Sequence, residues 1–597
     1  MANIDGWFRE AIQFNSEGSA AQALERCRKI LKKVPKHPGA LALAGVLSMD
    51  RGDAKEAIQY LQKAVKIHPG DGSVHLVLAR AFRSTGDHAG ARKALEQATG
   101  RGQSGARLFF EQGLLAMEEG QVSDSIRLLG KAVTLTPTSP EFAFELGVAK
   151  GIALDFPGCV QAFERAAALR PGHALSEDQA LFFTLYDETL SLAEVRARHD
   201  KWGSEQMARL QNLSPIVHTN RPDPERPLRV GLISGDFRQH AVTYFLQPLL
   251  THPNPDVFEL TCYANVEKPD AVTEVQRSLV PRWRDIVYDT DAQVAQRIRE
   301  DGIDILIDLS GHSTGNRLRV MALRPAPVQA TWLGHPSTTG LPTVDYRLTD
   351  RELDPPGTER FYRERHAYIE GGFCAYEPPP DSVAPEVGPL PAVANGHVTF
   401  GSVMNPRKIN ERVIGLWSRV LTQVPGSQLK LLRSTFRRGE MREKFLEAFE
   451  AHGVDRSRVE ITGDDNSGWD DVLGFYNTVD LSMDTFRYNG HTTTCEALWM
   501  GVPVVALSGE AYIGRVGQAL YAMLDLPEMV AESEDAFVSL AVGLANDTSR
   551  LSALRAGMRD RMRASRLLDA EGFTAAFADS LRRMWREWCA EKASRPG

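Results

Sequence analysis

A period of 34 residues organises the first third of the chain. The clearest column at this spacing holds Gly18, Gly52, Gly86, Gly120 and Leu154. Prolines close four of the five repeats, at Pro35, Pro69, Pro137 and Pro171. Each period is long enough for two short helices, and we expect glycine at their turn because a side chain would crowd the crossing. Proline then ends the second helix, and stacking supplies the core that one pair lacks.

This period and these columns resemble the tetratricopeptide repeat, with five repeats over about residues 4–171. The alternative is an irregular helical domain with chance spacing. The resemblance implies an α-solenoid over residues 1–171 that binds an extended protein partner in its concave groove. The columns do not identify that partner.

From residue 228 onward, short apolar runs alternate with helical stretches, which is typical of parallel sheets with βαβ crossovers. Expected strands of the first set are 228–234, 258–264, 304–310 and 327–333. After a Pro-rich break at 376–391, the second set is 397–402, 427–433, 459–463, 479–484 and 502–508.

The two sets predict two doubly wound, Rossmann-like lobes, residues 228–390 and 391–597. Residues 172–227 are then a helical cap and linker, and an amphipathic helix over 569–589 ends the second lobe. A ligand is expected at the carboxyl ends of the strands. The second half has neither GxGxxG nor GxxxxGK[ST], which disfavours a dinucleotide site and a P-loop ATPase.

Composition excludes several other classes of protein. The 597 residues are 43% hydrophobic and 24% charged, which are ordinary globular values, and the net charge of −8 argues against a nucleic-acid coat. The six cysteines form no CxxC pair, so neither a disulfide framework nor a zinc ribbon is indicated. Without a signal peptide or an 18-residue apolar run, we expect a soluble, cytoplasmic protein with no membrane span.

The most informative segment is DTFRYNGHTTTCEALWMGVPVVALSGE, residues 484–510. A strand ends at Asp484, a glycine-containing loop follows, and a helix begins with three threonines. Free N–H groups and the helix dipole at such a start bind phosphate oxygens, and Thr492, Thr493 and Thr494 add hydroxyl donors. Glu496 in the first turn is placed to accept hydrogen bonds from ribose hydroxyls. The alternative is simple helix capping.

Two further segments carry polar candidates. In FGSVMNPRKIN (400–410), Lys408 is a point charge suited to a diphosphate leaving group, and Asn405 suits a phosphate or sugar hydroxyl. The alternative for Lys408 is a solvated surface charge. In SGDFRQHAVTYFLQPLL (234–250), His240 is a candidate general base or hydroxyl-orienting group, or otherwise a helix N-terminal or core histidine.

The segment 308–340 contains GHSTG and GHPSTTG at two strand ends. Their glycines are expected to allow close backbone approach to a substrate, and His312 and His335 are further polar candidates. The alternative is ordinary turn chemistry.

Six ordered motifs resemble the O-GlcNAc transferase/SPINDLY family of glycosyltransferases. They are GDFRQHAVTYF, WRDI (283–286), GHSTGNRL, LRPAPVQATWLGHPSTTG, FGSVMNPRKIN and YNGHTTTCEALWMGVPVV. That family also joins tetratricopeptide repeats to a two-lobed GT-B region, so the resemblance covers nearly the whole chain. It implies an inverting, metal-independent transfer of a sugar from a nucleotide-sugar donor, with no further cofactor, to Ser or Thr hydroxyls of proteins.

The resemblance also implies roles for matching residues. Lys408 stabilises the departing diphosphate, Glu496 binds ribose, and Asn405 lies beside the donor. Phosphates are held by the helix start at His491, Thr492, Thr493 and Thr494. The sugar or acceptor pocket is lined by His312, Gly334, His335 and Pro336. His240 matches the family's cleft histidine, whose role as the base stays open.

The sequence departs from the O-GlcNAc branch in one stretch. Trp469 and Val472 stand where that branch has a Lys and a His, whereas WRDI and TTTCE look more like the SPINDLY branch, whose plant members use GDP-fucose. Bacterial proteins of this layout include flagellin glycosyltransferases that use nonulosonic acids, so flagellin is a candidate acceptor. The nucleotide stays open among UDP, GDP and CMP.

Two other hypotheses remain at this point. One is a repeat scaffold that binds proteins and carries a degenerate, inactive transferase region. The other is a glycogen-type or lipid glycosyltransferase, which would leave the repeat array without a protein to hold.

Overall fold

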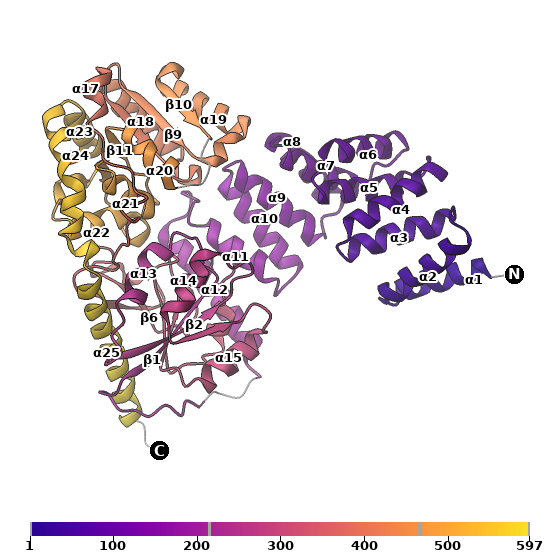
Figure 1. Cartoon of the computed structure of the whole chain (residues 1–597), viewed down its shortest axis with the longest axis horizontal. Coiled ribbons are helices and arrows are strands. Elements are labelled where there is room, and N and C mark those ends of the chain that lie inside the picture. The colour runs from indigo at the N-terminus through magenta and orange to yellow at the C-terminus, as the bar shows by residue number, and fades with distance from the viewer. Residues whose placement is uncertain (1–2, 213–216, 464–468, 595–597) are drawn as a thin grey trace. The chain divides into compact units, whose positions relative to one another are not determined.

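The computed structural model describes residues 3–212, 217–463 and 469–594, and it has two compact units, Met1–Ser176 and Glu177–Gly597. The first unit is a stack of helical pairs with the predicted period (Figure 1). Its helices are α1 (Ile4–Ser16), α2 (Ala20–Lys33), α3 (Pro38–Asp50), α4 (Ala54–Ile67), α5 (Gly72–Ser84), α6 (His88–Gly100), α7 (Ala106–Glu118), α8 (Val122–Leu135), α9 (Pro140–Ile152) and α10 (Phe156–Leu169).

The repeated glycine is required by its backbone conformation rather than by space. Gly18, Gly52 and Gly86 have φ values of 77°, 80° and 76°, and a Cβ built on any of them meets nothing within 4 Å. The expectation that a side chain would crowd the helix crossing is therefore wrong for these positions. Leu154 takes the same left-handed conformation, with φ 64°, although it carries a side chain.

This distinction gives a first prediction. We expect Gly52→Ala to lower the free energy of unfolding by about 1 kcal/mol, because alanine disfavours positive φ. Gly52→Asn should cost less, because asparagine tolerates the left-handed region better than alanine does. Urea denaturation followed by circular dichroism tests the order. If the larger asparagine is the more damaging residue, crowding rather than φ governs the turn.

The second unit begins with a seven-stranded parallel sheet of order β3-β2-β1-β4-β5-β6-β7. Its strands are β1 (Leu228–Ser234), β2 (Phe258–Ala264), β3 (Arg282–Asp285), β4 (Ile305–Asp308), β5 (Val328–Thr331), β6 (Tyr346–Thr349) and β7 (Arg365–Tyr368). The connecting helices are α13 (Thr243–Thr251), α14 (Ala271–Leu279), α15 (Asp291–Glu300) and α16 (Leu318–Ala322).

A second parallel sheet has the order β10-β9-β8-β11-β12-β13. Its strands are β8 (Thr399–Ser402), β9 (Gln428–Leu432), β10 (Val459–Thr462), β11 (Leu481–Met483), β12 (Val504–Leu507) and β13 (Val530–Ala531). Its helices are α17 (Pro391–Asn395), α18 (Glu411–Gln423), α19 (Gly439–Ala451), α20 (Trp469–Phe475), α21 (Thr492–Trp499), α22 (Val516–Met523), α23 (Glu534–Ala545) and α24 (Thr548–Arg563). The predicted solenoid followed by two doubly wound lobes is confirmed.

The last helix, α25 (Ala570–Ser594), returns to the first lobe (Figure 1). Phe577, Leu581 and Trp585 lie four residues apart on one face, are fully buried, and join the core that covers β1 and β4. An apolar stripe at this spacing needs an apolar surface to cover, and the first sheet supplies it. From the sequence, this helix was assigned to the second lobe (residues 391–597), so its packing on the first lobe was not predicted.

Helices α11 (Ala174–Phe183) and α12 (Leu192–Leu210) lead into the second unit. Trp202 packs into the core on the other face of the first sheet, and Glu177 forms ion pairs with Arg319 and Arg209, each at 2.7 Å. From residue 177 onward, the predicted cap is thus part of the two-lobed unit. The predicted linker at 212–227 lies partly outside the described residues.

Two sequence expectations concern the chain as a whole. All six cysteines are free, buried thiols, in agreement with the prediction of no disulfide framework. Among the described residues, no helix combines the length and the apolar character needed to cross a membrane.

Candidate active site

The predicted site residues lie in five loops that each begin where a parallel strand ends. These loops follow β1, β4 and β5 in the first lobe and β8 and β11 in the second. In both sheets the chain order reverses between neighbouring strands, β1 beside β4 and β8 beside β11. Ligands of doubly wound folds bind at this switch point, because the loops there diverge to opposite faces of the sheet.

Lys408 lies against the loop that leads into α21. Its Nζ donates a hydrogen bond to the backbone oxygen of Asn489 at 2.7 Å and lies 3.9 Å from the ring centroid of Tyr488. Because Asn489 precedes Thr492 by three residues, the ammonium group and the helix start are neighbours. Burial lowers the pKa of Lys408, and the negative charge of Asp484 opposes that shift.

Asn405 shapes the turn that carries this lysine. Its side chain accepts a hydrogen bond from the N–H of Arg407 at 3.1 Å and caps the short 3₁₀ helix η2 (Pro406–Lys408). The capped turn places Lys408 directly after β8, at the carboxyl edge of the second sheet.

The first turn of α21 presents unused N–H groups. The N–H of Thr494 donates to the carbonyl of His491 at 3.1 Å, whereas those of Thr492 and Thr493 have no acceptor among the described residues. The hydroxyl of Thr493 donates to Met404 Sδ at 3.0 Å, and that of Thr494 is fully buried. The groups left available for an anion at this helix start are therefore backbone amides, aided by the helix dipole, because the hydroxyls of Thr493 and Thr494 are engaged or buried.

The imidazole of His491 packs between the lobes. It stacks on Phe245 of α13 with a centroid distance of 3.7 Å, and its Nε2 lies 3.6 Å from the Sγ of Cys374. Burial lowers the pKa of His491 to about 3, and the charge of Lys408 acts in the same direction. The side chain is neutral, so it contributes packing rather than charge for a phosphate.

Glu496 is a half-buried carboxyl group that lies just after the first turn of α21, one turn later than predicted. Burial raises the pKa of Glu496 to about 7, and the guanidinium of Arg433 acts in the opposite direction. The charge of Glu496 contributes to the raised pKa values of Tyr244 and Tyr376, so these phenols lie near it. The ionised carboxylate is an acceptor for the hydroxyl groups of a sugar ring.

His240 lies in the loop between β1 and α13. Its Nδ1 accepts a hydrogen bond from the N–H of Val242 at 3.4 Å, and its Nε2 lies 3.8 Å from Asp236 Oδ1. Burial lowers the pKa of His240 and raises that of Asp236, while their mutual attraction opposes both shifts. An imidazole that is neutral near pH 7 is able to accept a proton. Because α13 carries Phe245, one short helix connects His240 to His491.

His312 and His335 lie in the core rather than on an open wall. Their side chains belong to residues that are 0% and 4% exposed, and the two rings lie 5.5 Å apart. The ring of His199, from α12, covers both at 4.9 and 5.8 Å. Both rings are buried against His199, and the role of these histidines in a sugar or acceptor pocket stays a prediction. In the described part of the chain, no group of three or more His, Cys, Asp or Glu side chains is arranged to hold a metal ion.

The glycines of the same two loops allow the loops to pack closely against each other. A Cβ on Gly334 would overlap the backbone oxygen of Leu309, and a Cβ on Gly311 would overlap His335. Both glycines therefore allow the neighbouring loop to approach closely, and the approach of a substrate at these positions stays a prediction. Pro336 is half-buried at the surface of this loop.

One support of the site has no motif in the sequence. The ring of Tyr186 stacks on Tyr488 at 5.2 Å, and Tyr488 in turn underlies Lys408. The preceding residue of the same loop, Arg487, donates a hydrogen bond to the carbonyl of Thr184 at 3.2 Å. Tyr488 belongs to the YNGHTTT motif, but Tyr186 lies in the turn that follows α11, outside the repeat columns, so nothing in the sequence marks it.

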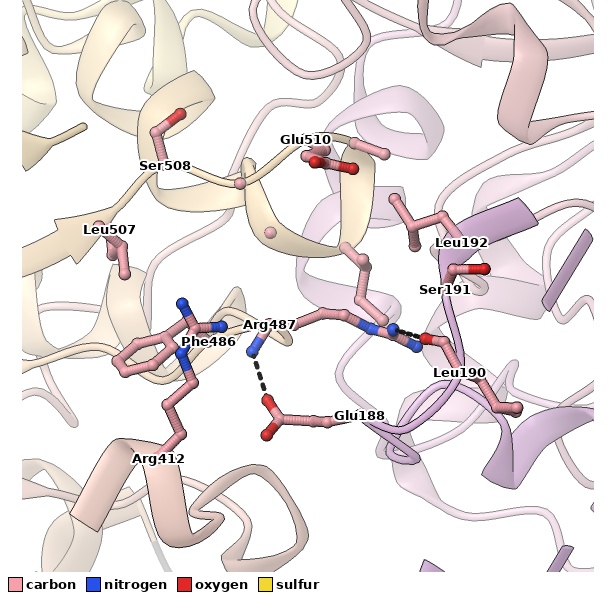
Figure 2. Close-up of a pocket in the computed structure, with 14 residues that line it drawn as sticks. Glu188, Leu190, Ser191, Leu192, Arg412, Phe486, Arg487, Leu507, Ser508 and Glu510 are labelled. Atoms are coloured by element: carbon pink, nitrogen blue, oxygen red, sulfur yellow. Dashed lines mark hydrogen bonds between the residues drawn. The ribbon is translucent and has the colours of Figure 1, made fainter. Parts of the chain in front are cut away.

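A pocket of about 770 Å³ lies beside this loop, at the carboxyl ends of β11 and β12 (Figure 2). One wall is the segment 188–192, and the facing wall is the segment 507–514 of the second lobe. Figure 2 shows Arg487 reaching between them, with its backbone N–H donating to Glu188 Oε1 at 3.4 Å. The segment 188–192, which follows α11, thus lies beside the loop between β11 and α21 that contacts Lys408.

The departures from the O-GlcNAc branch are only partly visible. Val472 is half-buried on α20, and the side chain of Trp469 lies outside the described part of the structure.

Comparisons with known proteins give the same division of the chain. Two models of the tetratricopeptide repeat match residues 15–72 and 48–108. A solved O-GlcNAc transferase mutant from Thermobaculum terrenum is 32% identical with a TM-score of 0.76, covering 87% of this chain and 98% of that one.

Plant relatives are similar over the two lobes. The probable UDP-N-acetylglucosamine–peptide N-acetylglucosaminyltransferase SPINDLY of Arabidopsis thaliana is 40% identical over 397 residues, 66% of this chain and 43% of the relative. The protein with the same name in Oryza sativa subsp. japonica is 37% identical over 438 residues, 72% of this chain and 46% of the relative. The chain thus spans less than half the length of these relatives.

The family model that matches the two lobes covers most of the second unit. The model described as glycosyl transferase family 41 matches residues 179–376 and 391–577, more than half of the chain. Its two matched segments include both sheets and every predicted site residue. The chain therefore belongs to glycosyl transferase family 41.

Proposed function

We propose that the protein transfers a sugar from a nucleotide-sugar donor to Ser or Thr hydroxyls of a protein acceptor. The observation that carries this proposal is the contact of Lys408 Nζ with the carbonyl of Asn489, a residue that lies three positions before the amide-bearing start of α21. A cation beside free N–H groups at a switch point suits the diphosphate of such a donor. The names of the plant relatives, which describe transfer of N-acetylglucosamine to peptides, support the same reaction class.

In the proposed reaction, the acceptor hydroxyl attacks the anomeric carbon from the face opposite the diphosphate. The bond between that carbon and the diphosphate oxygen breaks, so the configuration inverts and the diphosphate leaves with its electron pair. Lys408 and the N–H groups of Thr492 and Thr493 stabilise the leaving charge. Because the chain itself supplies this positive charge, we propose that neither a metal ion nor a further cofactor takes part. His240 is the proposed acceptor of the hydroxyl proton.

The acceptor is proposed to be recruited by the first unit. Stacked tetratricopeptide repeats bind extended polypeptides, and the helical pairs α1–α10 form such a stack. We propose flagellin as the first acceptor to assay, on the resemblance in layout to flagellin glycosyltransferases. Six buried, free thiols support a proposed cytoplasmic site of action.

A donor screen tests the proposal. The purified full chain is incubated with UDP-GlcNAc, GDP-fucose or a CMP-nonulosonic acid, and its thermal unfolding midpoint is measured. We expect one donor class to raise the midpoint, since a ligand that binds the native state stabilises it. With flagellin added, that donor should increase the acceptor's intact mass by one sugar residue. If no donor binds and no mass changes, the scaffold hypothesis replaces the enzyme.

A further inference from the structure

Asp484 ends β11 with a buried carboxylate that the proposed reaction does not use. It is 0% exposed, and its Oδ1 accepts hydrogen bonds from the N–H groups of Thr485 at 2.7 Å and Gly490 at 2.8 Å. One oxygen therefore joins the first and last residues of the loop 485–490. The other oxygen, Oδ2, is buried and has no hydrogen-bond partner among the described residues.

The loop that Asp484 closes is the one that receives Lys408, through the carbonyl of Asn489 and the ring of Tyr488. A buried carboxylate with an unpaired oxygen is costly unless a cation compensates its charge. Burial raises the pKa of Asp484 to about 7, and the charge of Lys408, which contacts the same loop, opposes that rise. Burial likewise lowers the pKa of Lys408 to about 8, and the charge of Asp484 opposes that fall.

Other charged groups act on the pair from the packed elements. Arg433, directly after β9, lowers the pKa of Lys408, and Lys408 lowers that of the neutral His491. From α22, the phenol of Tyr521 has its pKa raised in part by Asp484. Of these neighbours, Asp484 is the group that favours the charged form of Lys408.

We propose that Asp484 is a positioning residue for the transfer reaction, which holds the loop under Lys408 and supplies the negative charge that keeps its ammonium protonated until the donor diphosphate arrives. The inference rests on the proposed function, since it concerns the lysine assigned to the leaving group. Once bound, the diphosphate becomes the second countercharge of the same ammonium group.

The test is the pH dependence of nucleotide binding to the full chain. Isothermal titration with UDP, GDP and CMP between pH 7 and 9.5 finds the nucleotide that binds and the pH at which its affinity falls. Asp484→Asn keeps an oxygen for the two N–H groups and removes only the charge. We expect the alkaline fall to move to lower pH by about one unit, because an opposite charge is lost. At a pH below the fall of both proteins, where Lys408 is protonated in each, the variant should bind as tightly as wild type or tighter.

Two controls separate charge from structure. Asp480 lies at the other end of β11, is also 0% exposed, and accepts from the N–H groups of Thr399 at 2.8 Å and Ala392 at 2.7 Å. Asp480→Asn should leave the pH of the fall unchanged. Lys408→Arg stays protonated throughout this range, so adding Asp484→Asn to it should no longer move the curve.

The possible outcomes distinguish a failure of the inference about Asp484 from a failure of the proposed function. Wild type that binds none of the three nucleotides contradicts the proposed function itself. Wild type that binds, with an alkaline fall that Asp484→Asn leaves in place, overturns the inference alone. A variant weakened equally at every pH also overturns it, because the carboxylate then acts only on the loop.

Discussion

Lys408→Ala is expected to lower kcat/KM for sugar transfer by about a hundred- to a thousandfold. The lysine is the side-chain cation beside the helix start, and the leaving diphosphate gains negative charge as the sugar bond breaks. Loss of one such preorganised donor typically costs about that factor. Single-turnover assays at saturating donor measure the chemical step directly, and binding of the acceptor protein should be retained.

A second lysine of the same lobe provides the matched control. Lys430 lies on β9 and pairs with Glu460 at 3.5 Å, away from the loop 485–490. Lys430→Ala should leave transfer within about twofold of wild type, because an ion pair with an exposed partner such as Glu460 contributes little. Transfer by Lys408→Ala at the same rate as by Lys430→Ala would contradict the assignment of the leaving-group charge.

The strands that were predicted from the sequence are mostly those whose residues are buried within the two sheets. Residues 228–234 and 258–264 become β1 and β2 without any change of boundary, because apolar residues on both faces are visible in the sequence. Strands β3, β6, β7 and β13 were not predicted. The first of them, β3, is the edge sequence RWRD, and an edge strand need not be apolar on either face.

Some contacts of the candidate site could likewise be predicted from the sequence, whereas others depend on residues that are distant in the chain. Lys408 and the start of α21 come together because each follows a neighbouring strand of one sheet, which strand order and motif position predict. The burial of His312 depends on His199 from α12, more than 100 residues earlier in the chain. Tyr186 likewise contacts Tyr488 from the turn after α11, which is distant in the sequence. No local pattern encodes such contacts, so only the structure reveals them.

Arg347→Met is expected to produce the largest loss of stability. Arg347, on β6, is 3% exposed, and its Nε lies 3.2 Å from Oδ2 of Asp354, which is 0% exposed. The guanidinium also lies 4.0 Å from the ring of Tyr362 and 5.0 Å from that of Tyr512 in the second lobe. Tyr362 completes the cluster by donating to Asp354 Oδ1 at 2.7 Å and accepting from the N–H of Tyr512 at 3.1 Å.

Removing this cation leaves the Asp354 carboxylate buried without its partner, which costs about 3–5 kcal/mol in the free energy of unfolding. The double variant Arg347→Met/Asp354→Leu should recover part of that loss, because it buries no charge. Arg365→Met tests an exposed arginine, paired with Glu587 at 3.1 Å, and should cost less than about 1 kcal/mol. Urea denaturation followed by tryptophan fluorescence compares the three. If the single and double variants unfold at the same urea concentration, the cost is lost packing between the lobes and not an uncompensated charge.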